Sequence, residues 1–306
     1  MIRLRDIPLP PEHNAHQLQF EAAQMLHISV SKIRHLRIVR RSVDARKKPD
    51  IKIIYTIDVA VDGNEKRLLK QSGCKRATIA PVSYYKAAKH VPEPAQRPVV
   101  VGFGPAGMFT GLILAMAGLK PIILERGEDA QTRHEKVQKF WETGELDVRS
   151  NVQFGEGGAG TFSDGKLNTL NKDPFLRNKE VLKIFVKMGA KETILYDQKP
   201  HLGTDDLVDI VKNLRKEIIR LGGEVRFGCK VTDLCLDALG KVTGVQINEN
   251  EVLASDVVVL ALGHSARDTF ELLSQMPLVL ENKAFAIGVR MEHPQEMIGL
   301  AQYGES

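Results

Sequence analysis

The chain has 306 residues, of which 43% are hydrophobic and 26% charged, and it carries a formal net charge of +5. Such a chain can both build a core and dissolve, and its length predicts about two domains. The three cysteines form no CxxC pair and no metal-ligand spacing, which argues against a disulfide scaffold, a zinc site and a redox dithiol. Met1–Asp6 lacks the apolar region of a secretory signal, which predicts a cytoplasmic protein.

The charge is unevenly divided along the chain. Residues 1–95 have an excess of Lys and Arg, whereas residues 96–306 have an excess of Asp and Glu. Between the two parts lies His90–Pro98, where three prolines restrict the backbone to extended or turn conformations. We therefore expect a basic N-terminal domain over 1–95, a short linker, and a second domain over 96–306.

The first part predicts a small α+β domain. Met1–Arg5 favours a short strand, and the apolar residues of Ala15–Leu26 recur at helical spacing. Two strand-like runs follow, Ile33–Val43 and Ile51–Val61, and the second alternates apolar and polar residues. We expect a helix packed on a small antiparallel sheet.

A cluster of cations lies within and after the first of these long strands, and it has two interpretations. On a nucleic acid or another acidic partner, such side chains would neutralise phosphates or carboxylates. On a sheet with one exposed face, they would be a solvated surface that also discourages edge pairing. Both interpretations stay open for Arg34, Arg37, Arg40, Arg41, Arg46, Lys47 and Lys48.

The second part opens with a strand-turn-helix motif that is typical of dinucleotide binding. After the apolar run Val99–Val101, Gly102 permits a tight turn, Gly104 lets the backbone approach a pyrophosphate, and Gly107 lets the helix pack closely on the strand. Pro105 fits an early helical position, because its missing N–H is no loss there. The helix N-terminus would then face the pyrophosphate.

An acid follows at the spacing that this motif needs. Glu125 ends the apolar run Ile122–Leu124 and lies 23 residues after Gly102, close to the spacing of about 20 for a carboxylate that binds ribose hydroxyls. The uncharged stretch Pro98–Leu119 has the length of a membrane span. Its glycines and proline argue instead for a buried strand and helix, so no membrane partner is expected.

A second glycine-rich loop, Gly155–Gly165, follows a long polar segment. Its small residues would let main-chain N–H groups reach a flavin or its phosphates, and Thr161 and Ser163 add hydroxyls. The alternative is a surface loop without a ligand.

Further along, Thr204–Leu221 has a repeating apolar face, with Thr204 or Asp205 as N-cap and Gly222 and Gly223 as its end. The strand Glu224–Phe227 follows, and in a dinucleotide fold it is a third parallel strand. The next turn would pass near the adenine, which makes the backbone of Val231 a candidate contact.

Two runs, Val231–Leu236 and Val242–Ile247, predict a β-meander. The apolar run Val257–Leu262 then predicts a strand buried on both faces. Its end, Ala261–Gly263, would bring backbone close to the cofactor at the carboxyl ends of the parallel strands.

Together, these motifs resemble FAD-dependent oxidoreductases of the glutathione-reductase type, and more narrowly a bacterial group of uncharacterised FAD-dependent dehydrogenases with a small N-terminal domain. The resemblance covers nearly the whole chain. It implies an α/β fold, an FAD/NAD(P)-binding Rossmann-like domain with a small N-terminal α+β domain. The segments that carry it are Arg41–Lys48, Val101–Met108, Glu125–Gly127, Gly155–Leu167 and Phe285–Pro294.

By this resemblance, the first glycine motif with Ala106 would hold the FAD pyrophosphate, Glu125 the ribose, Arg126 the ribose edge and Val231 the adenine. The full set of predicted cofactor-binding residues is Gly102, Gly104, Pro105, Ala106, Gly107, Glu125, Arg126, Arg133, Gly157, Gly158, Ala159, Gly160, Thr161, Val231, Ala261, Leu262 and Gly263.

The implied function is that of a flavoprotein oxidoreductase, in which hydride passes through flavin N5 and NAD(P)H is a possible electron donor. The substrate is not implied. Because it follows Gly263, His264 is the candidate catalytic residue, although no acid–base constellation surrounds it in the sequence. The alternative is a flavoprotein whose basic N-terminal domain binds RNA or another acidic partner.

One feature of the resembling family is missing from the sequence. A later Gly-Asp segment normally closes over the flavin, and none is found before Ser306. We therefore expect a C-terminally truncated chain, with a substrate domain that starts at about residue 265 and a strand at Ala284–Met291. An inactive fragment is a further alternative.

Overall fold

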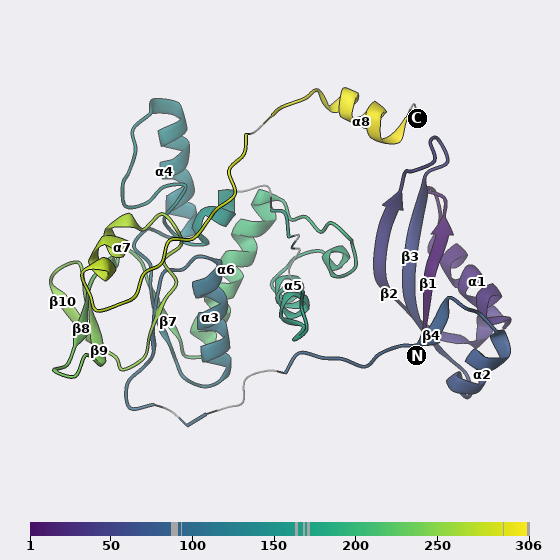
Figure 1. Cartoon of the computed structure of the whole chain (residues 1–306), viewed down its shortest axis with the longest axis horizontal. Coiled ribbons are helices and arrows are strands. Elements are labelled where there is room, and N and C mark those ends of the chain that lie inside the picture. The colour runs from purple at the N-terminus through teal and green to yellow at the C-terminus, as the bar shows by residue number, and fades with distance from the viewer. Residues whose placement is uncertain are drawn as a thin grey trace.

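The computed structural model describes residues 1–86, 91–92, 94–162, 165–167, 169, 172–289 and 291–304. Within them the chain forms two α/β units, one on an antiparallel sheet and one on a parallel sheet (Figure 1). Of the sequence predictions, the Ser163 hydroxyl and the start of the linker at His90 lie outside the described residues. Among the described helices, none combines the length and the apolarity needed to cross a bilayer.

The N-terminal unit is a four-stranded antiparallel sheet with two helices on one face. The sheet order is β2-β3-β1-β4, which leaves β2 at an edge. The helix α1 has the predicted bounds, and Asn14 and Gln17 form a capping box at its start. The elements are β1 (Ile2–Leu9), α1 (Ala15–Leu26), η1 (Val30–Lys32), β2 (Ile33–Asp44), β3 (Lys52–Val61), α2 (Glu65–Ser72) and β4 (Ala77–Ile79).

The larger unit is built on four parallel strands in the order β11-β5-β6-β7. These are β5 (Val99–Val101), β6 (Ile122–Leu124), β7 (Glu224–Arg226) and β11 (Val258–Leu260). The helices α3 (Pro105–Met116) and α6 (Thr204–Arg220) pack together beside the sheet, and their apolar residues form the main core with Val100 and Phe103. The strand order reverses next to β5, and doubly wound sheets bind their ligands at such a switch point.

The remaining elements surround this sheet. A meander in the order β10-β9-β8 packs at one side, with α7 against β8 (Figure 1). These elements are α4 (Ala130–Thr143), η2 (Gly158–Phe162), α5 (Arg177–Lys187), η3 (Glu192–Leu195), β8 (Val231–Leu236), β9 (Val242–Ile247), β10 (Glu251–Ala254), α7 (Arg267–Ser274) and α8 (Gln295–Tyr303).

Two local predictions were wrong. The strand predicted at Val257–Leu262 is shorter and lies at the edge of its sheet, so Val257 and Leu260 are 51% and 38% exposed rather than buried on both faces. The helix α6 has Gly203 as its N-cap, without a capping side chain, in place of Thr204 or Asp205.

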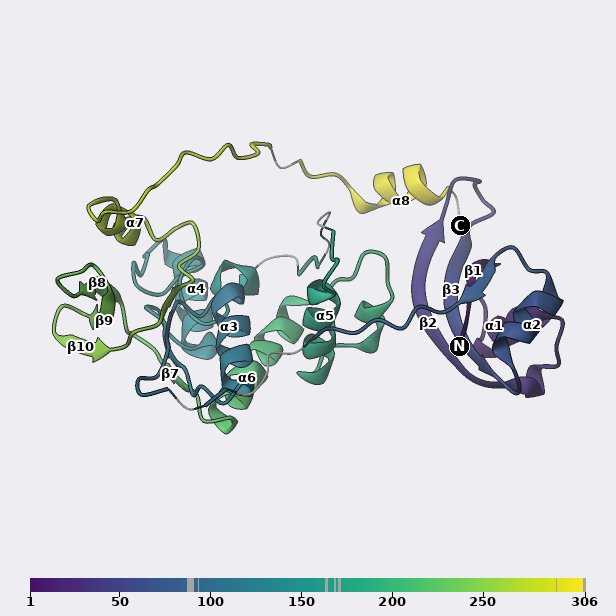
Figure 2. The same cartoon turned by 60° about the horizontal axis from the view of Figure 1, so that its bottom comes forward.

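The strand predicted at Ala284–Met291 is also not formed in the described part of that segment. The chain instead runs extended between α7 and α8, as Figure 2 shows. Its apolar residues alternate with others and are 72% to 90% exposed at Phe285, Ile287, Val289 and Met291. The segment therefore has the alternating apolar pattern of a strand but, in its described part, not the hydrogen-bonded partner strand.

Candidate functional site

A pocket of about 560 Å³ lies at the carboxyl ends of β5, β6 and β11. This volume is within the usual range for small-molecule sites. Its lining includes the first glycine turn, the second glycine loop and the turn after β11. The two glycine segments touch, because a Cβ at Gly158 would lie 2.9 Å from the Cα of Gly104.

Two glycines of the first glycine turn, Gly102 and Gly107, have no room for a side chain. Gly102 has φ +100°, and a Cβ there would lie 2.5 Å from the carbonyl oxygen of Ala261. A Cβ at Gly107 would overlap the carbonyl oxygen of Gly102. Gly104 is the N-cap of α3, and its carbonyl accepts a hydrogen bond from Met108 N–H. The N–H groups of the first turn come before this bond and have no acceptor within the helix. They form a partial positive charge at the pocket.

Glu125 ties the loops around the pocket together. Its side chain is 5% exposed, and Oε2 accepts a hydrogen bond of 2.7 Å from Phe103 N–H. Oε1 accepts from the N–H groups of Gly127 and Gly155, both at 2.9 Å. Each carboxylate oxygen can accept two hydrogen bonds, so Oε2 can accept one more from a ligand.

The second glycine loop is fixed by buried polar contacts. Gly157 N–H donates to the Phe103 carbonyl at 2.9 Å, and a Cβ at Gly157 would overlap the Thr161 hydroxyl. The fully buried Glu156 accepts from Ala130 N–H at 2.7 Å and pairs with Arg215 at 3.2 Å. Burial raises the pKa of Glu156 despite these contacts. The loop is thus anchored to the elements on both sides of it.

Arg133, a predicted cofactor-binding residue, is fully buried. It does not line the pocket, and its guanidinium donates to main-chain carbonyls both before and within the second glycine loop. The contacts are Nε to Asn151 at 2.8 Å, Nη2 to Val152 at 3.0 Å and Nη1 to Glu156 at 2.6 Å. Burial lowers its pKa to about 10. Arg133 therefore holds the backbone at the start of the loop in place without lining the pocket.

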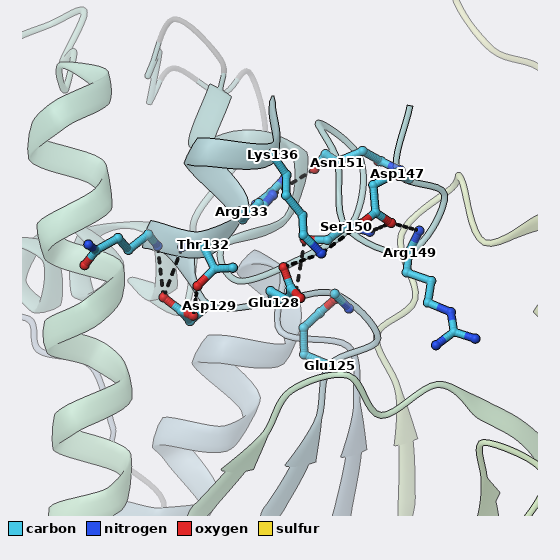
Figure 3. Close-up of polar contacts among 12 residues, drawn as sticks. Glu125, Glu128, Asp129, Thr132, Arg133, Lys136, Asp147, Arg149, Ser150 and Asn151 are labelled. Carbon is cyan, nitrogen blue, oxygen red and sulfur yellow. Dashed lines mark hydrogen bonds and ion pairs between the residues drawn. The ribbon is translucent and has the colours of Figure 1, made fainter. Parts of the chain in front are cut away.

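Figure 3 shows the polar contacts around this segment. Asp129 caps α4 by accepting from the N–H groups of Gln131 and Thr132. About two turns after Asp129, Lys136 lies between two carboxylates, 2.7 Å from Glu128 and 2.8 Å from Asp147. The segment before the second glycine loop is thus held to α4 by side chains as well as by packing.

Most of the predicted residues are brought together at the pocket. Those that line it are Gly102, Gly104, Pro105, Ala106, Glu125, Arg126, Gly158, Ala159, Gly160, Val231, Ala261, Leu262, Gly263 and the exposed His264. Gly107, Arg133, Gly157 and Thr161 are packed behind the lining. His264 has a weak contact, 3.4 Å from the Ser265 hydroxyl.

Sequence reasoning missed the helix α7 and the aromatic residue before the second loop. Phe154 lines the pocket, and the Arg126 guanidinium lies 4.2 Å from the centre of its ring. Thr269, Phe270 and Leu273 of α7 line the pocket as well. Because Phe154 directly precedes the second glycine loop, the sequence could have indicated it as a pocket residue. Nothing local in the sequence indicates that α7 lines the pocket.

At the rim of the pocket, Asp268 of α7 pairs with Arg126 at 3.0 Å and with Lys230 at 2.8 Å. Burial favours its neutral form, but hydrogen bonds from these cations outweigh burial and hold the pKa of Asp268 below its ordinary range. A lowered pKa stabilises the fold above the unfolded value of about 3.9, and this contribution is lost as the pH falls below it.

We therefore expect Asp268→Asn to reduce the loss of stability on acidification from about pH 5 to about pH 2. Denaturant unfolding across this range measures it. The matched control is Asp256→Asn, which changes an exposed aspartate. Parallel pH profiles for the wild type and Asp268→Asn would contradict the expected role.

Within the described residues, no group of three or more His, Cys, Asp or Glu side chains is arranged to hold a metal ion.

The chain is similar to one domain family, to one curated relative and, over part of its length, to solved structures. Residues 1–60 match a domain of unknown function, DUF8436. An uncharacterised protein of Clostridium beijerinckii (strain ATCC 51743 / NCIMB 8052) is 45% identical over 306 residues, which are 100% of this chain and 56% of the relative. The chain therefore spans about half the length of this curated relative.

Two solved structures are similar to part of the chain. FAD-bound OTEMO is 17% identical, with a TM-score of 0.35, over 56% of this chain and 26% of OTEMO. THI4 of Thermovibrio ammonificans is 21% identical, with a TM-score of 0.38, over 60% of this chain and 62% of THI4. These likenesses are distant, so the geometry of the pocket carries the functional proposal.

Proposed function

We propose that the pocket binds FAD and that the protein is an FAD-dependent oxidoreductase. The observation that carries this proposal is the meeting of two glycine segments and a buried carboxylate at the carboxyl ends of parallel strands. In a dinucleotide site, the N-terminus of α3 binds the pyrophosphate and Glu125 binds the adenosine ribose. Val231, which is buried at the pocket wall, would meet the adenine.

The residues present fit such a ligand. At Gly104 a Cβ would have one neighbour within 4 Å among the described residues, the Cα of Gly158 at 3.7 Å, so the missing side chain leaves room on the pocket side of this turn. The first-turn N–H groups of α3 provide partial positive charge beside this space. A pyrophosphate needs both features, because it is bulky and negatively charged.

The chain's own residues would bind and orient the ligand rather than transfer protons. The Glu125 carboxylate can accept a hydrogen bond from a ribose hydroxyl, and its negative charge would repel a 2′-phosphate at the same position. Ala261–Gly263 would bring backbone groups to the dinucleotide at the end of β11. The bound flavin would supply the chemistry by accepting a hydride at N5 from a substrate or from a reduced nicotinamide.

The test is a titration of the purified chain with FAD, followed by flavin fluorescence and visible absorbance. We expect saturable binding of FAD and weaker binding of FMN, which lacks the adenosine that Glu125 and Val231 would contact. NADP should compete poorly because of its 2′-phosphate. A protein that neither carries a flavin nor binds FAD saturably would refute the proposal.

In the part of the chain that the structure describes, no specific contact favours the alternative of an RNA-binding N-terminal domain. Four of the seven clustered cations pair with carboxylates of this chain: Arg34 with Asp62, Arg37 with Asp58, Arg41 with Asp197 and Arg46 with Asp44. Ion pairs of this kind reduce the positive charge that is available to phosphates. The cluster is better explained by contacts within the chain, and we do not propose a nucleic-acid function.

A further inference from the structure

The edge of the N-terminal sheet is paired with a segment of the larger unit. Arg41 in β2 donates its N–H to the Tyr196 carbonyl at 2.7 Å, and its carbonyl accepts from Gln198 N–H at 3.0 Å. Its guanidinium also binds Asp197 in a bidentate pair, with Nε and Nη2 at 2.6 and 2.9 Å from the carboxylate oxygens. Main chain and side chain thus join the two units at the same residue.

The residues that follow this segment in the sequence are hydrogen-bonded to the end of the second glycine loop. Leu167 N–H donates to the Pro200 carbonyl at 3.1 Å, and Leu202 N–H donates to the Gly165 carbonyl at 3.0 Å. Gly165 has φ +62°, and a Cβ there would overlap the Leu202 carbonyl oxygen. The loop end is therefore held in one position by the residues that follow the docking contact.

From Leu202 the contacts reach the pocket. Leu202 is 2% exposed and belongs to the same core cluster as Phe103. The N–H of Phe103 donates to Glu125, and its carbonyl accepts from Gly157 of the second glycine loop. Hydrogen bonds at the loop end, a shared core cluster and the hydrogen bonds of Phe103 thus link the segment bound by Arg41 to both glycine segments.

We infer that Arg41 and Asp197 are positioning residues through which docking of the N-terminal unit holds the second glycine loop in its ligand-binding conformation. The inference rests on the proposed binding of FAD at this pocket. The two states are the docked unit, with residues 196–202 fixed, and the undocked unit, with this segment released. Since linkage is reciprocal, FAD must favour docking by the same factor by which docking favours FAD.

Charge reversal tests the pair. Arg41→Asp and Asp197→Arg should each weaken FAD affinity about fivefold or more, the lower end of typical coupling between sites. The double variant Arg41→Asp/Asp197→Arg restores an ion pair and should recover affinity. The matched control is Arg46→Asp, because Arg46 is exposed and, among the described residues, forms its ion pair with the nearby Asp44. It should leave FAD affinity unchanged.

Equal losses of affinity in Arg46→Asp and Arg41→Asp, or a double variant as weak as both single variants, would overturn the inference. Far-ultraviolet circular dichroism shows whether each variant is folded. For a variant that fails to fold, Asp197→Asn provides a milder break of the same pair and should weaken binding in the same direction.

A second measurement separates this inference from the proposed function, because it needs no FAD. Amide hydrogen exchange at Leu167 and Leu202 reports directly on the bonds that hold the loop end. Arg41→Asp should speed exchange at both amides, and Arg46→Asp should not. A wild type that does not bind FAD rejects the proposed function alone, whereas unchanged exchange in Arg41→Asp rejects the coupling.

Discussion

Gly104→Ala should weaken FAD binding about 10- to 100-fold and leave the stability of the fold within about 1 kcal/mol of wild type. The backbone at Gly104 has φ −76° and ψ −174°, which alanine adopts readily. The added methyl would meet only the Cα of Gly158, at an ordinary contact distance of 3.7 Å. It would, however, occupy the space proposed for the pyrophosphate. FAD titration and denaturant unfolding measure the two effects separately.

The control for this variant is Gly107→Ala, which adds the same methyl three residues later. There the methyl would overlap the Gly102 carbonyl, so we expect a loss of stability of about 1–3 kcal/mol or more. Wild-type affinity for FAD in Gly104→Ala would show that the pyrophosphate is not bound against this turn.

Arg133→Met should lower the free energy of unfolding by about 1–3 kcal/mol or more. Methionine fills much of the volume but leaves the carbonyls of Asn151, Val152 and Glu156 without their buried donor. Arg133→Lys should recover only part of this loss, because a single ammonium cannot reproduce the planar fork of donors. Denaturant unfolding with and without FAD is the measurement.

Lys136→Met on the same helix is the matched control for Arg133→Met. Its pairs with Glu128 and Asp147 are partly exposed, so the expected cost is about 1 kcal/mol or less. If Arg133→Met kept wild-type stability and lost only FAD binding, Arg133 would act as a direct ligand and its assignment as a loop-shaping residue would be wrong.

The sequence predicts best those features that are encoded locally. The helix α1 and the strand β3 follow apolar periodicity, and α3 follows its glycine turn, so the structure has these elements close to their predicted bounds. The convergence of the glycine segments also follows, since parallel strands end at one edge of the sheet.

What sequence reasoning missed depends on contacts between distant residues. Arg126 pairs with Asp268 across 142 positions, and Arg41 with Asp197 across 156. For Arg133, the sequence shows a cation near a glycine loop but not the carbonyls that it binds. The exposure of β11 follows from its edge position, which only the topology reveals.

The extended segment between α7 and α8 has a consequence for the behaviour of the chain in solution. Phe285, Ile287, Val289 and Met291 are exposed apolar residues, and the described backbone around them is not paired in a sheet. Such a segment is a template for pairing with a strand of another molecule. Intermolecular association at high concentration should therefore begin here rather than at the glycine-lined pocket.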